Sequence, residues 1–362
     1  MVRLIRPEGR LIRAARYIDP RGEAFADVLL DPADGRVLTY APPQRNVLDL
    51  GPLTLLPGMV DAHVHLALPP PRLGDDPVGV MAGRLVACLD HGLVAVRDGG
   101  DRLGATLRLK KRGGVPRLLA CGPALHPPGS YGSFLGPASR IDAIAGQIAG
   151  LADAGADHVK FLVTGPVNLE SPMMIDPPHF SAAALERLTT EAHRRGLKVM
   201  AHANGVTGVR LALDAGVDSL EHGYGMDEDT LALLAAGRTV WVPTLVPMAA
   251  LRDAGPTSSR KAAATLLARQ MEAVRRAGER GVNVAVGTDA GAPGVVHGAS
   301  YLRELLLLRE AGLPPEALVR AAAGESVLGP YGTGGRPWTF VAVSGNPLAD
   351  TGSLGRVEAI IV

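Results

Sequence analysis

Two hydrophobic patterns alternate along the chain, and the change between them divides it into two parts. Residues 1–56 carry short apolar runs separated by turn sequences such as Asp19-Pro20-Arg21-Gly22, a pattern typical of short β-strands. From residue 57 onward, strand-like apolar runs alternate with longer helix-like segments, and residues 335–362 return to the first pattern. We therefore predict a small β-sandwich lobe built from residues 1–56 and 335–362. Residues 57–334 form a second domain inserted between its halves.

The inserted part contains eight predicted strands. They are expected at residues 55–65, 93–99, 117–123, 158–165, 198–204, 219–223, 240–245 and 283–289. Helices that stop at a glycine are expected between them, at residues 141–154, 181–195, 206–215, 229–236 and 258–280. Two more are expected at 302–312 and 315–323. Eight strands alternating with helices predict an α/β fold of the (β/α)8 TIM-barrel type, whose chemistry lies at the C-terminal ends of the strands.

Side chains with metal-binding chemistry end several of these strands. His63 and His65 are two residues apart on the first strand, so both imidazoles point to one face. The candidates on later strands are Lys160, His202, His222 and Asp289. A single histidine here is more often a hydrogen-bonded core residue, and a single aspartate more often caps a turn. Their shared position at one barrel mouth predicts a metal site, and imidazole with carboxylate ligands suits zinc.

Lys160 is the unusual member of this set, because an ammonium group cannot bind a cation. It lies in the apolar strand 158–165, where burial is expected to lower its pKa. A neutral amine can add CO₂ to form a carbamate, whose two oxygens can bridge two metal ions. The alternative is a lysine that pairs with an acid or binds a substrate carboxylate.

Six short segments follow one another in an order that resembles the amidohydrolase superfamily. They are residues 57–65, 96–100, 159–165, 201–205, 219–223 and 287–291. More narrowly, the chain resembles the branch of Xaa-Pro dipeptidases and carboxypeptidases with a carboxylated lysine, which is related to imidazolonepropionases. The resemblance covers residues 57–329. In the loops at 126–132 and 165–166 the sequence departs from that branch, so the substrate stays open.

The resemblance implies two divalent metal ions, most often Zn²⁺. One ion is expected at His63, His65 and Asp289, and the other at His202 and His222. A CO₂-derived carbamate on Lys160 and a hydroxide are expected to bridge them. Asp289 is expected to accept the proton of the attacking water and to pass it to the leaving nitrogen, which makes Asp289 and Lys160 the predicted catalytic residues.

These features predict a binuclear metal-dependent hydrolase that cleaves an amide-type C–N bond in a peptide, an N-acyl amino acid or a cyclic amide. The enzymatic alternatives are a deaminase of an amino-substituted heterocycle and a lactone hydrolase, and the non-enzymatic alternative is an inert assembly scaffold. Lys160 argues against the deaminase, and the full ligand set argues against the scaffold. The predicted substrate contacts are His126, Tyr131, Tyr224 and His297.

Two neighbouring residues at the end of the second strand have two possible roles. Arg97 and Asp98 either pair with each other and brace the site or contact the substrate directly.

Composition narrows the choice of partner. The 37 Lys and Arg residues nearly balance the 36 Asp and Glu residues, so a small-molecule substrate is expected rather than a nucleic acid. We find no long apolar stretch for a membrane span and no signal-peptide pattern, and two cysteines suit a cytoplasmic protein. A homo-oligomer is expected from the family resemblance only. A Gly-x-Ser-x-Gly elbow and a phosphate-binding loop are both missing from the sequence.

Overall fold

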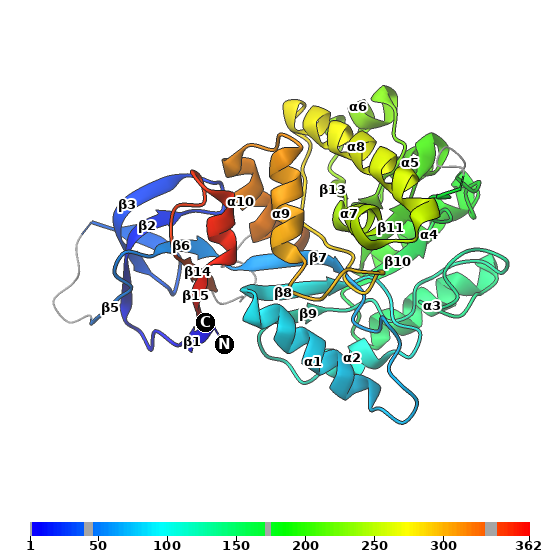
Figure 1. Cartoon of the computed structure of the whole chain (residues 1–362). Helices are drawn as coiled ribbons and strands as arrows, with labels where there is room; N and C mark the ends of the chain where they lie inside the picture. The colour runs from blue at the N-terminus through cyan, green and yellow to red at the C-terminus, as the bar shows by residue number, and fades with distance from the viewer. Residues whose placement is uncertain (1, 40–45, 171–174, 330–338) are drawn as a thin grey trace.

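The first lobe of the protein is a mixed β-sheet made from both chain ends. The computed structural model describes residues 2–39, 46–170, 175–329 and 339–362. The strands of this sheet are β1 (Arg3–Ile5), β2 (Leu11–Ile18), β3 (Ala24–Asp31), β4 (Arg36–Leu38), β5 (Val47–Asp49), β6 (Thr54–Pro57), β14 (Phe340–Val343) and β15 (Val357–Ile361). Their order is β1-β15-β14-β6-β2-β3-β4, with β5 beside β2 (Figure 1). The pairings thus join these strands edge to edge in one sheet, where the sequence predicted a sandwich.

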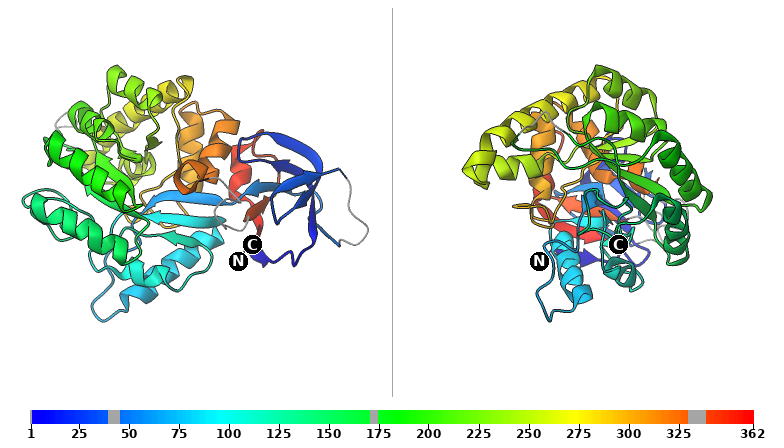
Figure 2. Two further views of the ribbon diagram at one scale, coloured as in Figure 1. Left: turned by 180° about the vertical axis from the view of Figure 1, so that it is seen from behind. Right: turned by 90° about the vertical axis from the view of Figure 1, so that its right-hand side faces the viewer.

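The two chain ends meet inside this sheet. β1 runs parallel to β15, with Arg3 opposite Ala359, so the ends of the chain lie side by side (Figure 2). β14 pairs with β6 in antiparallel register, with Phe340 opposite Pro57. The buried side chains of the lobe come from both ends: Ile12, Ala14, Tyr17, Val28, Leu30, Leu55, Phe340, Ala342, Ala359 and Ile361. This core can therefore form only when the first and last segments of the chain come together.

The second part is built on seven parallel strands in two sheets. One sheet contains β7 (Met59–Val64), β8 (Leu93–Asp98) and β9 (Arg117–Leu119), and the other contains β10 (His158–Leu162), β11 (Lys198–Ala203), β12 (Ser219–His222) and β13 (Val240–Val242). A parallel bridge between Leu125 and Phe161 joins the two sheets. On the other side, residues 283–290 lie between β13 and β7. The pairings thus follow one another around a ring, in the order that a (β/α)8 barrel requires.

The predicted eighth strand, residues 283–289, makes these links without forming a regular strand. Ala285 donates a backbone hydrogen bond to Trp241, and Val286 accepts one from Ala62, so the segment contacts β13 and β7. Only isolated bridges occur in it, at Val284 and Ala290. The segment ends at Asp289, which adopts a positive φ of 57°.

The predicted first strand, residues 55–65, is divided at Gly58 into β6 of the mixed sheet and β7 of the ring. The Gly58 amide donates to the Thr339 carbonyl at 2.8 Å. A Cβ at this position would lie 2.2 Å from Cγ2 of Val94, so only glycine fits without movement of its neighbours. The other predicted boundary, between residues 334 and 335, lies outside the described residues.

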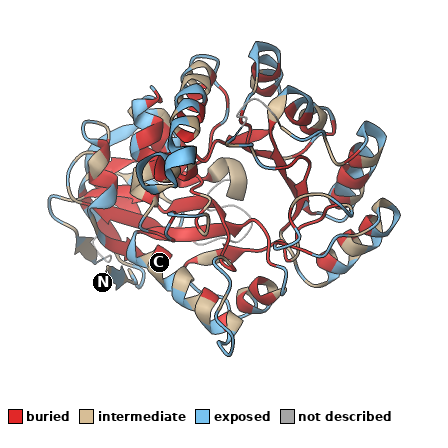
Figure 3. Ribbon diagram, turned by 45° about the vertical axis from the view of Figure 1, so that its right-hand side comes forward, coloured by how far each residue is buried: buried red, intermediate tan, exposed pale blue. Residues whose placement is uncertain are grey.

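Helices cover the outside of the ring, with their outer faces exposed and the strands buried (Figure 3). They are α1 (Pro77–Asp90), α2 (Ala105–Lys110), α3 (Ile141–Asp153), α4 (Ala182–Arg194), α5 (Gly205–Asp214), α6 (Glu228–Ala236), α7 (Val246–Ala254), α8 (Thr257–Glu279), α9 (Tyr301–Glu310), α10 (Pro315–Ala323) and α11 (Glu325–Leu328), and a 3₁₀ helix spans Thr351–Gly355. The seven predicted helices are confirmed to within about two residues at each end. In the described parts of the chain, every helix is too short or too polar to cross a membrane.

Candidate metal centre

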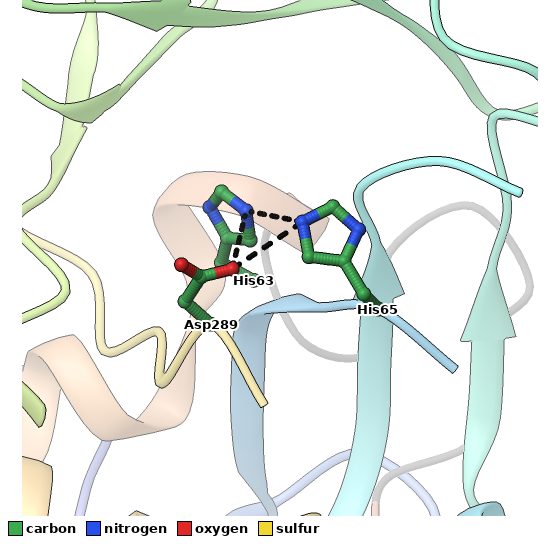
Figure 4. A group of neighbouring side chains, drawn as sticks. All are labelled: His63, His65 and Asp289. Carbon is green, nitrogen blue, oxygen red and sulfur yellow. Dashed lines mark hydrogen bonds and ion pairs between the residues drawn. The ribbon is translucent and has the colours of Figure 1, made fainter. Parts of the chain in front are cut away.

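Three side chains come together where β7 and the segment 283–290 end. His63 and His65 contribute their Nε2 atoms, which lie 3.3 Å apart, and Oδ1 of Asp289 lies 3.5 and 3.3 Å from them (Figure 4). All three potential ligand atoms lie within 4.8 Å of one another. Two imidazoles and a carboxylate facing one point form a possible metal site.

Asp289 stays ionised in this setting. Burial by itself would raise the pKa of Asp289, but the hydrogen bond from His65 and the nearby ring of His63 lower it overall. Burial lowers the pKa of His63 well below its usual range, and Lys160 lowers it further. The site therefore combines a carboxylate with a neutral imidazole, which are the protonation states that metal ligands need.

The ring of His63 is held in place by Glu221, a residue to which the sequence analysis assigned no role. Nδ1 of His63 lies 2.7 Å from Oε2 of Glu221, so it donates to the carboxylate and leaves Nε2 free to bind a cation. Glu221 also accepts hydrogen bonds from Arg97 at 2.7 Å and from Ser219 at 2.6 Å. Glu221 is fully buried. The available signal was a glutamate beside His222 in a short predicted strand.

Arg97 and Asp98 have separate partners. Arg97 donates to Glu221, to Ser219 and to the Ala62 carbonyl, all within 2.8 Å. Asp98 accepts from the amides of Leu66 and Gly100. The predicted pairing of Arg97 with Asp98 is therefore wrong, because adjacent residues on a strand point to opposite faces. The bracing role remains, since Arg97 holds Glu221 and Asp98 holds the loop after β7.

A second carboxylate, Asp61, fixes the segment that carries Asp289. It accepts hydrogen bonds from the amide of Thr288 at 3.0 Å and from its hydroxyl at 2.6 Å. It also accepts from the amide of His63 at 3.2 Å. Asp61 thereby ties the two strand ends of the possible metal site to each other.

Lys160 is buried with 1% of its surface exposed, and it lies in the middle of β10 rather than at the strand end where the sequence placed it. Its Nζ has no hydrogen-bond partner among the described residues. Burial lowers the pKa of Lys160 to about 8, against the opposing effect of Glu221. A buried amine without a partner is unusual, because an unpaired buried polar group is costly. Of its two alternative roles, pairing with an acid is thus not seen in these contacts.

His202 and His222 end the next two strands, β11 and β12. Their ring centroids lie 4.6 Å apart, and the ring of His222 lies 4.9 Å from that of His63. Nδ1 of His222 lies 2.7 Å from the hydroxyl of Thr244, while Nε2 of His202 lies 3.2 Å from the Gly165 carbonyl. The structure therefore brings the two histidines beside the first cluster, and their role as ligands stays a prediction.

Backbone strain is concentrated in this region. His222, Thr244 and Asp289 have φ values of 65°, 49° and 57°, a conformation that residues other than glycine rarely adopt. They follow or end the sixth, seventh and eighth strand positions of the ring. Gly99 packs closely against the ring of His65, because a Cβ at position 99 would lie 2.9 Å from that ring. Strain and close approach of this kind cluster at functional sites.

A cavity of about 310 Å³ opens above these residues. His65, Lys160, His202, His222 and Asp289 line its floor, together with two of the predicted substrate contacts, Tyr131 and Tyr224. The hydroxyl of Tyr224 donates to the Thr244 carbonyl at 2.8 Å, so Tyr224 offers the cavity its ring. A concave space next to a cluster of titratable groups is where a ligand is expected.

The other two predicted substrate contacts lie outside this lining. Nδ1 of His126 is 3.0 Å from the Ser130 hydroxyl, and its Nε2 is 3.1 Å from the Gly136 carbonyl. His297 donates from Nε2 to the His65 carbonyl at 3.1 Å. These hydrogen bonds indicate that His126 stabilises its loop and that His297 stabilises the backbone at His65. Direct substrate contact by either histidine stays a prediction.

Comparison with known proteins decides the family. A model described as the amidohydrolase family matches residues 54–323. The chain belongs to the amidohydrolase family. The family resemblance drawn from its strand-end motifs is thereby confirmed, and the protein is an amidohydrolase-superfamily hydrolase with a possible metal site at His63, His65 and Asp289.

Relatives of this amidohydrolase extend over most of its length. It is 29% identical over 335 residues to an uncharacterised protein of Mycobacterium tuberculosis, covering 89% of this chain and 86% of the relative. It is 30% identical over 211 residues to ochratoxinase of Aspergillus niger, covering 54% of this chain and 42% of that enzyme. A solved structure of a Xaa-Pro dipeptidase with bound methionine matches with a TM-score of 0.81 at 23% identity, covering 96% of this chain and 97% of that one. That likeness shows the fold.

Proposed function

We propose that this amidohydrolase is a binuclear metal-dependent enzyme that cleaves an amide-type C–N bond at the mouth of a (β/α)8 barrel. The observation that carries the proposal is the His63, His65 and Asp289 cluster, whose ligand atoms lie within 4.8 Å of one another beside a buried amine without a partner. The first three residues would hold one ion. His202 and His222 would hold a second, and a carbamate on Lys160 would bridge the two.

The side chains fit this arrangement on three counts. Glu221 holds the proton of His63 on Nδ1, so Nε2 faces the site with a lone pair. Burial lowers the pKa of His202 to about 4, which keeps that imidazole neutral. Nζ of Lys160 has the lowered pKa that carbamate formation needs, and no described group forms a hydrogen bond with it.

When bound, zinc-like ions would lower the pKa of a water and polarise the amide carbonyl. Asp289 then serves as the base, because its carboxylate lies at the cavity wall and its lowered pKa keeps it ionised and able to accept a proton. It takes a proton as the water oxygen bonds to the carbonyl carbon, and it returns that proton to nitrogen as the C–N bond breaks. The products are a carboxylic acid and an amine.

Lys160 also separates this proposal from one of its alternatives, the deaminase. A heterocycle deaminase that relies on one ion has no need of a buried, unpartnered lysine beside the second pair of histidines. A lactone hydrolase would use the same groups and differ only in its leaving oxygen. A comparison of lactone hydrolysis with amide hydrolysis by the purified enzyme separates these two.

The test combines metal content with a direct signal from the lysine. Zinc-loaded protein should hold about two equivalents of metal per chain, as the binuclear site requires, and ¹³C-labelled CO₂ should produce a carbamate carbonyl resonance. Lys160→Ala should abolish that resonance and amide hydrolysis, with partial recovery on adding short carboxylic acids. Lys261→Ala, at an exposed position on α8, is the matched control and should behave as the wild type. Full activity of Lys160→Ala would contradict the bridging role.

A further inference from the structure

The cavity above the candidate metal centre is lined mainly by apolar side chains. They come from the loops after β7, β9 and β10, from the start of α7 and from the loop after Asp289: Leu68, Phe134, Leu135, Leu162, Pro166, Val167, Leu169, Pro247, Met248, Leu251, Ala292 and Pro293. Leu135 and Leu162 are buried, and Phe134 is 42% exposed at the rim. A substrate bound here would therefore replace water contacts with apolar contacts on most of its surface.

Within the described part of the chain, this lining contains no arginine, and its single lysine is Lys160. Lys160 belongs to the metal centre, where a carbamate would turn it into an anion. Among the described residues, the lining thus offers a substrate carboxylate no arginine or lysine beyond the metal centre itself.

A helix start could replace such a cation, because backbone amides at a helix N-terminus bind anions. The start of α7 reaches the cavity through Pro247 and Met248. However, the amides of Leu245 and Val246 donate to the two carboxylate oxygens of Glu304 at 2.9 and 2.7 Å. Glu304 is fully buried, and Pro247 has no amide hydrogen to offer. An acidic residue of the protein already occupies the anion position of this helix.

We infer that the substrate is an uncharged, apolar amide, whose groups on both sides of the scissile C–N bond carry no carboxylate. The inference rests on the proposed hydrolytic function and names its substrate class. A carboxylate placed among these side chains would lose its hydration without gaining a charged partner. Hydrolysis adds water across the C–N bond, so the only carboxylate of the reaction is the one formed at the cleaved carbonyl, next to the metal centre.

A matched pair of compounds tests this preference. N-benzoyl-L-leucine carries a free carboxylate, and N-benzoyl-L-leucinamide replaces it with a neutral carboxamide of the same shape. Release of benzoate by the zinc-loaded enzyme should show a kcat/KM at least about 30-fold higher for the leucinamide, since an unpaired buried charge is costly. An equal or higher value for the carboxylate compound would overturn the inference and leave the hydrolase proposal standing.

A binding measurement distinguishes a wrong substrate class from a wrong proposed function. If neither compound is cleaved, the hydrolase proposal fails for this class of bond. Calorimetric titration of the zinc-loaded protein with each compound still decides the inference. Tighter binding of the neutral compound supports it, and equal or tighter binding of the carboxylate compound overturns it.

A variant pair asks whether a missing cation is the physical reason. Met248 is half-buried in the lining, so Met248→Arg places a guanidinium at the cavity wall. This variant should raise kcat/KM or affinity for the carboxylate compound by at least about 10-fold relative to the wild type. Met248→Gln, of similar length without a charge, is the control and should give no such gain. An equal gain in both variants, or in neither, would refute the charge argument.

Discussion

Replacing Glu221 with Gln should weaken metal binding and stability together, for two separable reasons. The carboxylate accepts hydrogen bonds from His63 at 2.7 Å, from Arg97 at 2.7 Å and from Ser219 at 2.6 Å, inside a fully buried site. An amide has the same shape but only one oxygen. It can accept from His63 or from Arg97 and must turn its NH₂ group toward the other donor.

Two magnitudes follow from these contacts. Leaving the buried Arg97 guanidinium without an anion should lower the free energy of unfolding by about 3 kcal/mol, at the low end for a broken buried pair. Removing the carboxylate from Nδ1 of His63 should weaken metal affinity by about 10- to 100-fold. Urea unfolding of the metal-free protein measures the first effect, and competition with a zinc chelator measures the second.

Control variants separate the two effects. Ser219→Ala removes two hydrogen bonds, one donated to Glu221 and one accepted from Arg97, and keeps the anion. It should therefore cost about 2 kcal/mol of stability and leave metal affinity nearly unchanged. The double variant Arg97→Leu with Glu221→Leu removes both charges and should recover stability while metal affinity stays low. An unchanged zinc affinity in Glu221→Gln would refute the role assigned to Glu221 in holding His63.

Three further predictions concern other parts of the molecule. Gly58→Ala should lower the free energy of unfolding by at least about 2 kcal/mol in urea, because its Cβ would meet Val94. The control Gly146→Ala lies on an exposed helical face where a Cβ meets nothing within 4 Å, and it should raise the free energy of unfolding by about 0.5–1 kcal/mol. Equal effects of the two substitutions would contradict the packing argument. Thr288→Val should cost about 1–3 kcal/mol in the same assay, because it removes the 2.6 Å hydrogen bond to buried Asp61, and a neutral effect would show that this tie is dispensable. Removing metal with a chelator should lower the midpoint temperature of unfolding. Free zinc at 100 times its Kd would stabilise the folded state by about 2.7 kcal/mol. An unchanged midpoint would argue against a bound ion.

The sequence by itself determined the order of elements and the positions of the strand-end side chains. Alternating strand and helix patterns are local properties of the chain, so the limits of seven helices could be predicted to within about two residues. The helices α1, α2, α7 and α11 were not predicted. The histidine pair at 63 and 65 and the later strand ends were recognisable because side-chain alternation and the barrel rule assign them to one face and one end. The same local signals identified the family that comparison with known proteins confirmed.

Only the tertiary structure decided which groups support those side chains. Glu221 contacts His63 across 158 positions of sequence, and Thr288 contacts Asp61 across 227. Glu304 reaches the start of α7 from a later helix. Such pairings depend on how strands and helices close in three dimensions, which no local pattern records. For the same reason the sequence predicted a sandwich for the lobe, whose strands pair in one sheet.

The substrate also depends partly on single residues of the sequence and partly on how the loops pack together. The sequence placed a metal-binding set at the strand ends, because those residues are read from single positions. The mostly apolar lining of the cavity comes from segments far apart in the chain, including residues near 68, 134, 166, 248 and 293, and its only described lysine or arginine is Lys160. Whether a cation faces the substrate depends on the packing of all these segments together. The candidate metal ligands could therefore be recognised in the sequence, whereas the proposed preference for an uncharged substrate rests on the fold.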